Sequence, residues 1–178
     1  MKKRLILAVV WVVLFPMTVF AQLGGYGYDS GDSEFTMTGS GSNDEDFDNM
    51  SLNVQGTLGY FTTEYLELFL RQDFGYSDVS RGDDVWTAAT RIGFDIVFDL
   101  SRYKPFIGAN AGYAYGDDKV IEDQFIAGPE LGLKYFATRD AYLYGLMEWQ
   151  FLFEKVKDAD EKFDDGRYVY SIGVGFKF

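Results

Sequence analysis

The chain ends with RYVYSIGVGFKF, residues 167–178, and this stretch decides the fold. Every second residue counted back from Phe178 is large and apolar, whereas most of the residues between them are small or polar. Such alternation predicts a β-strand with two unlike faces. A soluble protein seldom places its strongest strand at its last residue, because chain ends fray. We therefore expect a strand that pairs with the first strand and closes a barrel, so that no free edge is left.

The same alternation recurs along most of the chain, and helical periodicity is hard to find. Short connectors such as TTE and TRD take turns with longer, acidic ones, which predicts antiparallel neighbours and two unlike barrel ends. The fold class that we expect is all-β: an eight-stranded antiparallel up-and-down transmembrane β-barrel. Its strands are predicted at residues 33–42, 51–61, 65–76, 85–99, 105–116, 124–137, 141–154 and 167–178.

Aromatic residues support a membrane location, because they gather at both ends of the predicted strands. Leu, Ile, Val, Ala and Gly dominate between the two groups, and a bilayer selects this arrangement at its two interfaces. The alternative is a secreted soluble barrel or sandwich whose apolar face points inward. The polar face carries too few charges for a water-facing exterior but suits a crowded lumen, and the strands are long for a soluble protein. The predicted bands are Tyr76, Trp86, Tyr113, Tyr115, Phe125, Phe151, Phe153, Tyr168 and Tyr170 at the loop side, and Tyr60, Phe94, Phe98, Tyr135, Phe176 and Phe178 at the turn side.

The first residues predict export. Residues 1–21 combine a basic start, an apolar run and a small residue at Ala21, as in a cleaved secretory signal peptide. Residues 22–32 are expected to form a flexible periplasmic lead-in, in which Tyr26 and Tyr28 could extend the first strand, and residues 33–178 the barrel domain. The formal net charge of −12 excludes nucleic acid as a partner, because phosphate binding needs clustered Lys and Arg.

Three stretches resemble a known family: PFIGANAGYAYGDD, AGPELGLKYFATRDAYLYGLMEWQFLF and the terminal YSIGVGFKF. They are similar to the eight-stranded outer-membrane β-barrel family, which includes OmpA-like and OmpX-like barrels, and the resemblance spans roughly residues 34–178. It implies the outer membrane of a Gram-negative bacterium, with its lipid and lipopolysaccharide as surroundings. It also implies that the barrel-assembly machinery reads Tyr170, Phe176 and Phe178 as a signal. It implies no activity, because members of the family do different things.

The chain has no His and no Cys, which removes the usual nucleophilic triads and zinc sites. A carboxylate pair could still act alone, as in glycoside hydrolysis. A salt-bridged plug is the better interpretation, because the interior of an eight-stranded barrel is just wide enough for side chains to fill it. We expect no cofactor and no wide pore. The polar residues predicted to face the lumen are Glu67, Arg71, Asp73, Arg91, Asp95, Glu130, Lys134 and Glu148.

The acidic connectors NDEDFD and DADEKFDDG could gather Ca²⁺ or Mg²⁺, although solvated loops are the more common outcome for such segments. The function that we expect is a structural or interaction role for a monomeric, non-enzymatic barrel with a side-chain-filled lumen. Its acidic loops could bind an extracellular ligand. A small channel or uptake component, and an enzyme acting on lipid or glycan, stay open as alternatives.

Overall fold

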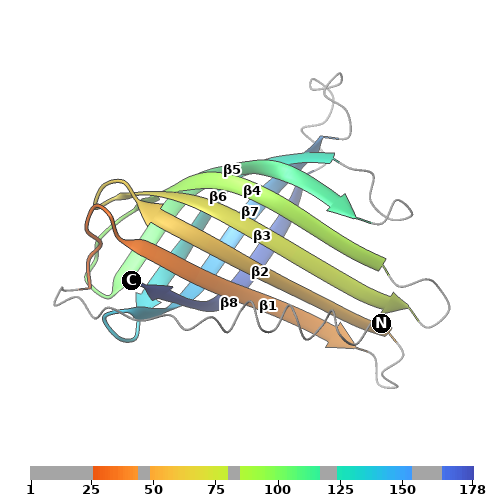
Figure 1. The fold of residues 1–178 in the computed structure, drawn as a ribbon, viewed down its shortest axis with the longest axis horizontal. Helices are drawn as coiled ribbons and strands as arrows, with labels where there is room; N and C mark the ends of the chain where they lie inside the picture. The colour runs from red at the N-terminus through yellow and green to blue at the C-terminus, as the bar shows by residue number, and fades with distance from the viewer. Residues whose placement is uncertain (1–25, 44–48, 80–84, 117–123, 154–165) are drawn as a thin grey trace.

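The computed structural model describes residues 26–43, 49–79, 85–116, 124–153 and 166–178. Their strands form one closed barrel in which each strand is antiparallel to the next and β8 returns to β1 (Figure 1). The prediction of an eight-stranded antiparallel barrel is confirmed. The strands are β1 (Ser33–Asn43), β2 (Asn49–Phe61), β3 (Leu66–Val79), β4 (Val85–Val97), β5 (Tyr103–Gly116), β6 (Gln124–Phe136), β7 (Ala141–Phe153) and β8 (Gly166–Lys177).

The two ends of the barrel are defined by the connectors. Residues 62–65, 98–102 and 137–140 join strands at one end, which we call the turn side and which lies at the left of Figure 1. The strands β2 and β3 reach further toward the opposite end, the loop side, than the alternation predicted. The acidic segments expected to form loops there fall largely on residues 44–48 and 154–165, outside the described residues. Within the described ranges, no helix is long and apolar enough to cross a membrane.

The closure between β1 and β8 is short. It is anchored at the turn side, where the backbone N–H of Phe178 donates to the oxygen of Ser33 (2.8 Å) and the N–H of Ser33 donates to the oxygen of Phe178 (3.0 Å). The register then runs only from Glu34↔Lys177 to Thr38↔Gly173. The strands β2 and β3, in contrast, stay in register along the whole of β2. The barrel is thus closed firmly at its turn side and over a smaller part of its height at this one seam.

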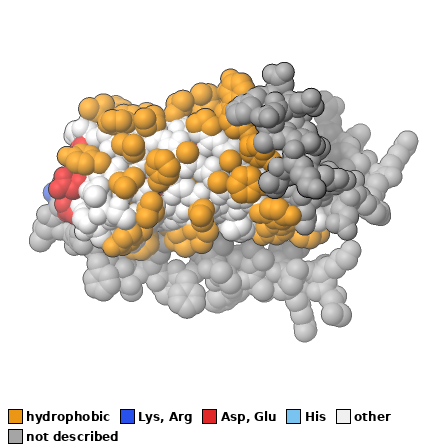
Figure 2. All heavy atoms as spheres, turned by 90° about the horizontal axis from the view of Figure 1, so that it is seen from above, with side chains coloured by type: hydrophobic (Ala, Val, Ile, Leu, Met, Phe, Trp, Pro, Cys, Tyr) orange, Lys and Arg blue, Asp and Glu red, His pale blue; other side chains and the backbone are white. Residues whose placement is uncertain are grey.

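The two faces of the wall follow the alternation in the sequence. Large apolar side chains point outward and are exposed, and in the view of Figure 2 they spread over the wall, while the acidic and basic side chains in sight lie at the turn side. The charged side chains that the structure describes in the strands point inward, and all but Asp73 are buried. The exposed set includes Leu58, Leu68, Leu70, Phe74, Ile92, Phe94, Ile107, Tyr113, Leu131, Leu143, Tyr170, Ile172 and Phe176.

Residues 26–32 differ from the expected flexible lead-in. The Tyr28 ring is buried and stacks on Phe61 with centroids 3.7 Å apart, and its hydroxyl donates to Glu34 Oε2 (2.6 Å). The backbone N–H of Gly31 donates to the oxygen of Phe61 (2.8 Å). The segment therefore folds back into the turn side, because its aromatic ring finds an apolar site there, and β1 begins only at Ser33.

A cluster of large side chains fills the turn-side lumen below the charged residues. These side chains come from the segment 26–32 and from strands β2, β4, β5, β6 and β7. The sequence predicted a lumen of small and polar residues, so this cluster, which we call the aromatic floor, was missed. Its members are Tyr28, Phe61, Val97, Phe106, Phe136, Tyr142, Tyr144 and Leu146.

Candidate functional site

The charged side chains inside the barrel form the candidate site, which we call the central network. Each comes from a strand position that shares the inward face, because side chains alternate between the two faces of a strand. All are buried except Asp73, which is partly exposed toward the loop side. The network consists of Glu34, Glu67, Arg71, Asp73, Arg91, Asp95, Glu130, Lys134 and Glu148.

Lys134 forms the layer of the network nearest the turn side. Its Nζ donates to Glu34 Oε1 (2.7 Å) and to Glu67 Oε2 (2.6 Å), which links β6 to β1 and β3 across the lumen. Its ammonium also lies above the rings of Tyr28 and Phe106, at 5.3 and 5.4 Å from their centroids. Lys134 is thus enclosed by two carboxylates and by the aromatic floor.

Arg71 and Glu130 form the middle layer as a bidentate pair. The two terminal nitrogens of Arg71 donate to the two oxygens of Glu130 at 2.8 and 2.9 Å, and Arg71 Nε donates to the Thr57 hydroxyl (3.2 Å). The Asn110 amide donates to both Glu130 and Glu148. Bidentate pairing of this kind is the strongest form of Arg–carboxylate contact.

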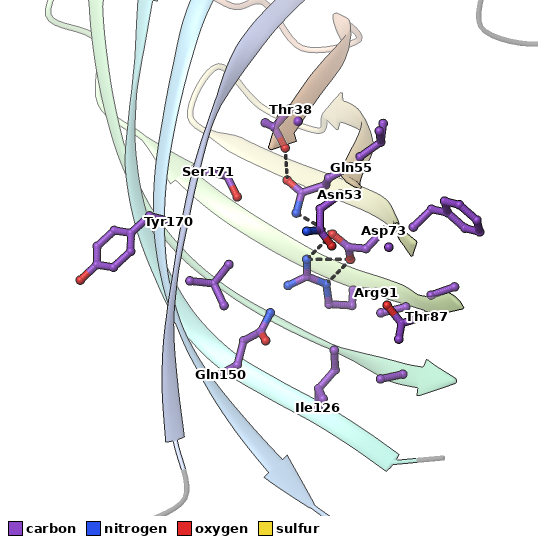
Figure 3. Close-up of a pocket in the computed structure, with 18 of the residues that line it drawn as sticks. Thr38, Asn53, Gln55, Asp73, Thr87, Arg91, Ile126, Gln150, Tyr170 and Ser171 are labelled. Carbon is purple, nitrogen blue, oxygen red and sulfur yellow. Dashed lines mark hydrogen bonds and ion pairs between the residues drawn. The ribbon is translucent and has the colours of Figure 1, made fainter. Parts of the chain in front are cut away.

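Arg91 forms the layer nearest the loop side. Its Nη1 lies 2.6 Å from Glu148 Oε2, and its Nη2 lies 2.8 Å from Asp73 Oδ2. The Gln55 amide donates to Asp73 (2.7 Å), and the Thr38 hydroxyl donates to Gln55 (3.3 Å). The chain of hydrogen bonds therefore runs from β7 through β4, β3 and β2 to β1 (Figure 3 shows its last members).

Asp95 was expected in the network, and it points inward with 2% exposure, opposite Glu67 in the register of β3 and β4. Its Oδ1 has no hydrogen-bond partner. Carboxylates outnumber cations in the central network, since only Arg71, Arg91 and Lys134 are positive. Burying an unpaired carboxylate is costly, so Asp95 is the least well satisfied member.

Several residues of the site were not predicted. Glu34 lies in β1 and Asn110 in β5, and neither was among the polar residues predicted to face the lumen. Lys104 and Lys177 face inward near the turn side and pair with Asp99 and Asp32. Lys177 has inward parity in the predicted last strand, which was a signal that could have revealed it, whereas Lys104 precedes the predicted start of its strand at residue 105.

Two groups outside the strands have shifted acidities. Burial, followed by the Glu34 carboxylate, raises the pKa of the Tyr28 hydroxyl well above its ordinary value. Partial burial alone would raise the pKa of Asp99, but its hydrogen bonds with Lys104 and with the Ser101 N–H lower it below the ordinary value. Both groups lie at the turn side, where burial and neighbouring charged groups together set their pKa values.

The residues expected to form the assembly signal all lie on the outward face of β8 or at its end. Tyr170 is exposed, as are Phe176 and Phe178. Their exposure separates them from the central network, whose charged side chains face the lumen.

The arrangement is one of buried ion pairs. Except for Asp95, every carboxylate of the central network is engaged by a cation. Glu148 links two layers, because it pairs with Arg91 and also lies 3.8 Å from Arg71 Nη1. Among the acidic side chains in the described ranges, no group is placed to hold a metal ion. These ion pairs connect strands on opposite sides of the barrel across the lumen.

No protein-family model and no curated protein sequence matches the chain. Among solved structures it is similar to the outer membrane protein OprG of Pseudomonas aeruginosa, with a TM-score of 0.57 and 15% identity over 87% of this chain and 99% of that chain. It is also similar to the N-terminal β-barrel domain of Pseudomonas aeruginosa OprF, with a TM-score of 0.53 and 19% identity over 84% and 98% of the two chains. Neisserial surface protein A has a TM-score of 0.50 and 14% identity over 82% of this chain and 92% of its own. At these identities the likeness concerns the fold, and the chain has the closed eight-stranded barrel fold of these outer-membrane proteins.

Proposed function

We propose that this chain is an integral outer-membrane protein of a Gram-negative bacterium, exported with residues 1–21 as a cleaved signal peptide, with a structural or interaction role. The observation that carries the proposal is the inversion of the barrel: its charged side chains are buried inside and its apolar side chains are exposed outside. Ile92 on β4 is 66% exposed, whereas Arg71 on β3 is 0% exposed. Water would penalise this arrangement, while a bilayer stabilises it.

The dimensions support the same conclusion. The strands are 11 to 14 residues long, and a tilted strand needs about 9–11 residues to cross a bilayer. Exposed aromatic side chains lie near both ends of the outer wall, with Tyr60 and Phe98 at the turn side and Trp86 and Tyr168 at the loop side. These are the positions of the two membrane interfaces in barrels of this kind.

The lumen supports a non-conducting barrel without enzymatic activity. The aromatic floor and the Lys134 and Arg71 layers are almost wholly buried, so that they separate the loop side from the turn side. In planar bilayers the refolded protein is therefore expected to be silent. Steady single-channel conductance would favour the alternative of a small channel or uptake component.

Membrane location is tested by fractionation. We expect the mature protein in the outer-membrane fraction, with a gel mobility that changes on heating because the barrel resists detergent until heated. Recovery in the soluble periplasmic fraction without such a shift would overturn the proposal.

The role of the last strand is tested separately. We propose that Phe178, with Phe176 and Tyr170, is recognised by the barrel-assembly machinery. Phe178→Ala should lower the amount of folded barrel in the outer membrane but leave the purified, refolded barrel equally stable. Equal amounts of folded barrel in cells would refute this role, and Phe125→Ala, another exposed aromatic, is the control.

The proposal for the loops rests on charge. The acidic segments would project from the cell surface beside lipopolysaccharide and could meet an extracellular ligand. We infer a single copy of the chain as the working unit, since one chain forms the whole ring of strands. Chemical cross-linking in intact outer membranes tests this, with a monomeric band as the expected result.

A further inference from the structure

The seam between β1 and β8 loses its pairing toward the loop side. The register ends at Thr38↔Gly173, yet β1 continues to Asn43 and β8 begins at Gly166. Beyond Thr38 and Gly173 each strand still pairs with its other neighbour, β2 or β7. We call the two facing edges, residues 39–43 and 166–172, the open seam. Unpaired strand edges are costly inside a bilayer, so a group that bonds to them would be stabilising.

Two side chains at the open seam are unusually exposed. Ile172 is 80% and Tyr170 is 71% exposed, more than any other large apolar side chain in the described part of the chain. Tyr170 belongs to the loop-side aromatic band, which the proposed function places at the outer interface of the membrane. The seam therefore opens at the level of the outer leaflet.

A cavity of about 650 Å³ lies inside the barrel at this level. Its lining includes Ser171, Tyr170 and Ile172 of β8 together with Thr38 and Gly39 of β1, so that it extends to the open seam. Figure 3 shows Ser171 and the β2–β4 polar side chains on the two sides of the cavity, while the ring of Tyr170 points away from them. A volume of this size lies in the range of about 300–1,000 Å³ found for small-molecule sites.

The lining selects the chemistry of the occupant. Asp73 and Arg91 are its charged members, and they are bonded to each other, so the lining has no net charge. The remaining polar groups are amides and hydroxyls, which both donate and accept hydrogen bonds. Apart from the hydroxyls of Tyr168 and Tyr170, they are Thr38, Asn53, Gln55, Thr87, Gln150 and Ser171.

We propose that this cavity binds a single-chain amphiphile of the outer leaflet, whose uncharged, hydroxyl-rich head lies among these amides and hydroxyls. Its alkyl chain passes through the open seam into the bilayer beside Ile172. The inference rests on the proposed membrane location and goes beyond it, because it assigns a ligand class to the loop-side lumen. A charged head is excluded by cost, since the lining offers it no unpaired countercharge.

The test is native mass spectrometry of the full mature chain in the zwitterionic detergent lauryldimethylamine N-oxide, titrated with n-dodecyl β-maltoside. We expect one saturable adduct for each barrel, bound at least about tenfold more tightly than dodecyl sulfate or free maltose. Dodecyl sulfate carries the same alkyl chain with a charged head, so it tests the selectivity for the head. Free maltose has the head without a chain, so it tests the contribution of the chain. Equal binding of all three, or an unsaturable series of adducts, would overturn the proposal.

Closing the seam provides the decisive variants, because the chain has no Cys of its own. Gly39 and Ile172 are the next positions in register beyond Thr38↔Gly173, so a Gly39→Cys/Ile172→Cys disulfide would close the opening. Oxidation should weaken maltoside binding at least about tenfold, and reduction should restore it. The control is Met37→Cys/Val174→Cys, which staples a pair that is already in register and should leave binding unchanged.

Should the first disulfide fail to form, Ser171→Trp decides the question by filling the cavity. Ile107→Trp is its control, because Ile107 is exposed on the outer wall and does not line the cavity. Heat-modifiable gel mobility verifies that each variant is folded. Loss of that mobility shift in the unmodified chain would count against the proposed function, whereas maltoside binding that survives both closure and Ser171→Trp would refute the site alone.

Discussion

Replacing Arg71 with Met tests whether the central network stabilises the barrel through charge. Arg71 is 0% exposed and donates two hydrogen bonds to Glu130 and one to Thr57. Met fills much of the same space but carries no charge, so Glu130 would remain as a buried carboxylate that has lost both hydrogen bonds from its cation. Breaking a buried pair in this way costs about 3–5 kcal/mol, and we expect the free energy of unfolding to fall by that amount.

The assay is equilibrium unfolding of the refolded mature chain in phosphatidylcholine vesicles, followed by tryptophan fluorescence. The double variant Arg71→Met/Glu130→Met should recover most of the loss, because a buried ion pair exchanged for apolar side chains is often neutral. Arg139→Met makes the same substitution at an exposed position of the turn 137–140, and it should change stability by no more than about 0.5 kcal/mol. A loss below about 1 kcal/mol for Arg71→Met, or no recovery in the double variant, would refute the reasoning.

Three further predictions concern other parts of the lumen. Asp95→Asn should raise the free energy of unfolding by about 1 kcal/mol, because it removes the charge of a buried carboxylate whose Oδ1 has no hydrogen-bond partner, and a lower denaturation midpoint would contradict this. Gly175→Ala should destabilise the barrel by about 1–3 kcal/mol, because its Cβ would overlap the buried Tyr142 ring. At Gly145 nothing lies within 4 Å of such a Cβ, so Gly145→Ala should have a midpoint near that of the unmodified chain, and equal losses at both sites would contradict the packing argument. Because the pKa of Tyr28 is raised, its contribution to stability is complete below about pH 10 and is lost as the pH rises through the folded-state value, so unfolding midpoints should fall above pH 10 less steeply in Tyr28→Phe.

The sequence predicted the strands and their faces because parity is local information. Glu67 and Arg71 differ by an even number of positions and share a face once the segment is known to be a strand, and the same holds for Glu130 and Lys134. Parity does not tell which inward residues meet across the lumen. The Glu34–Lys134 pair joins positions that are 100 residues apart, and only the closed register brings them together.

The aromatic floor shows a second limit. Phe61 follows Tyr60, and Phe136 follows Tyr135, so that both faces carry an aromatic ring near the turn side. The alternation of apolar and polar residues then identifies no unique outward face at these positions. Tyr60 and Tyr135 were assigned to the aromatic band at the membrane interface, and the inward rings of Phe61 and Phe136 were overlooked. Tyr28 was missed for a related reason, since a segment outside the strands has no parity from which burial can be inferred.

The short closure between β1 and β8 has a consequence for how the barrel becomes a ring. The first and last strands share few backbone bonds, yet β1 is also held through the interior, by Glu34 to Lys134 of β6 and by Thr36 to Tyr142 of β7. Joining segments so distant in sequence has a large entropic cost, which those few edge bonds offset only in part. We therefore expect closure of the ring to depend on the side chains inside as well as on the strand edges, so that a change in the lumen alters the rate at which the ring closes.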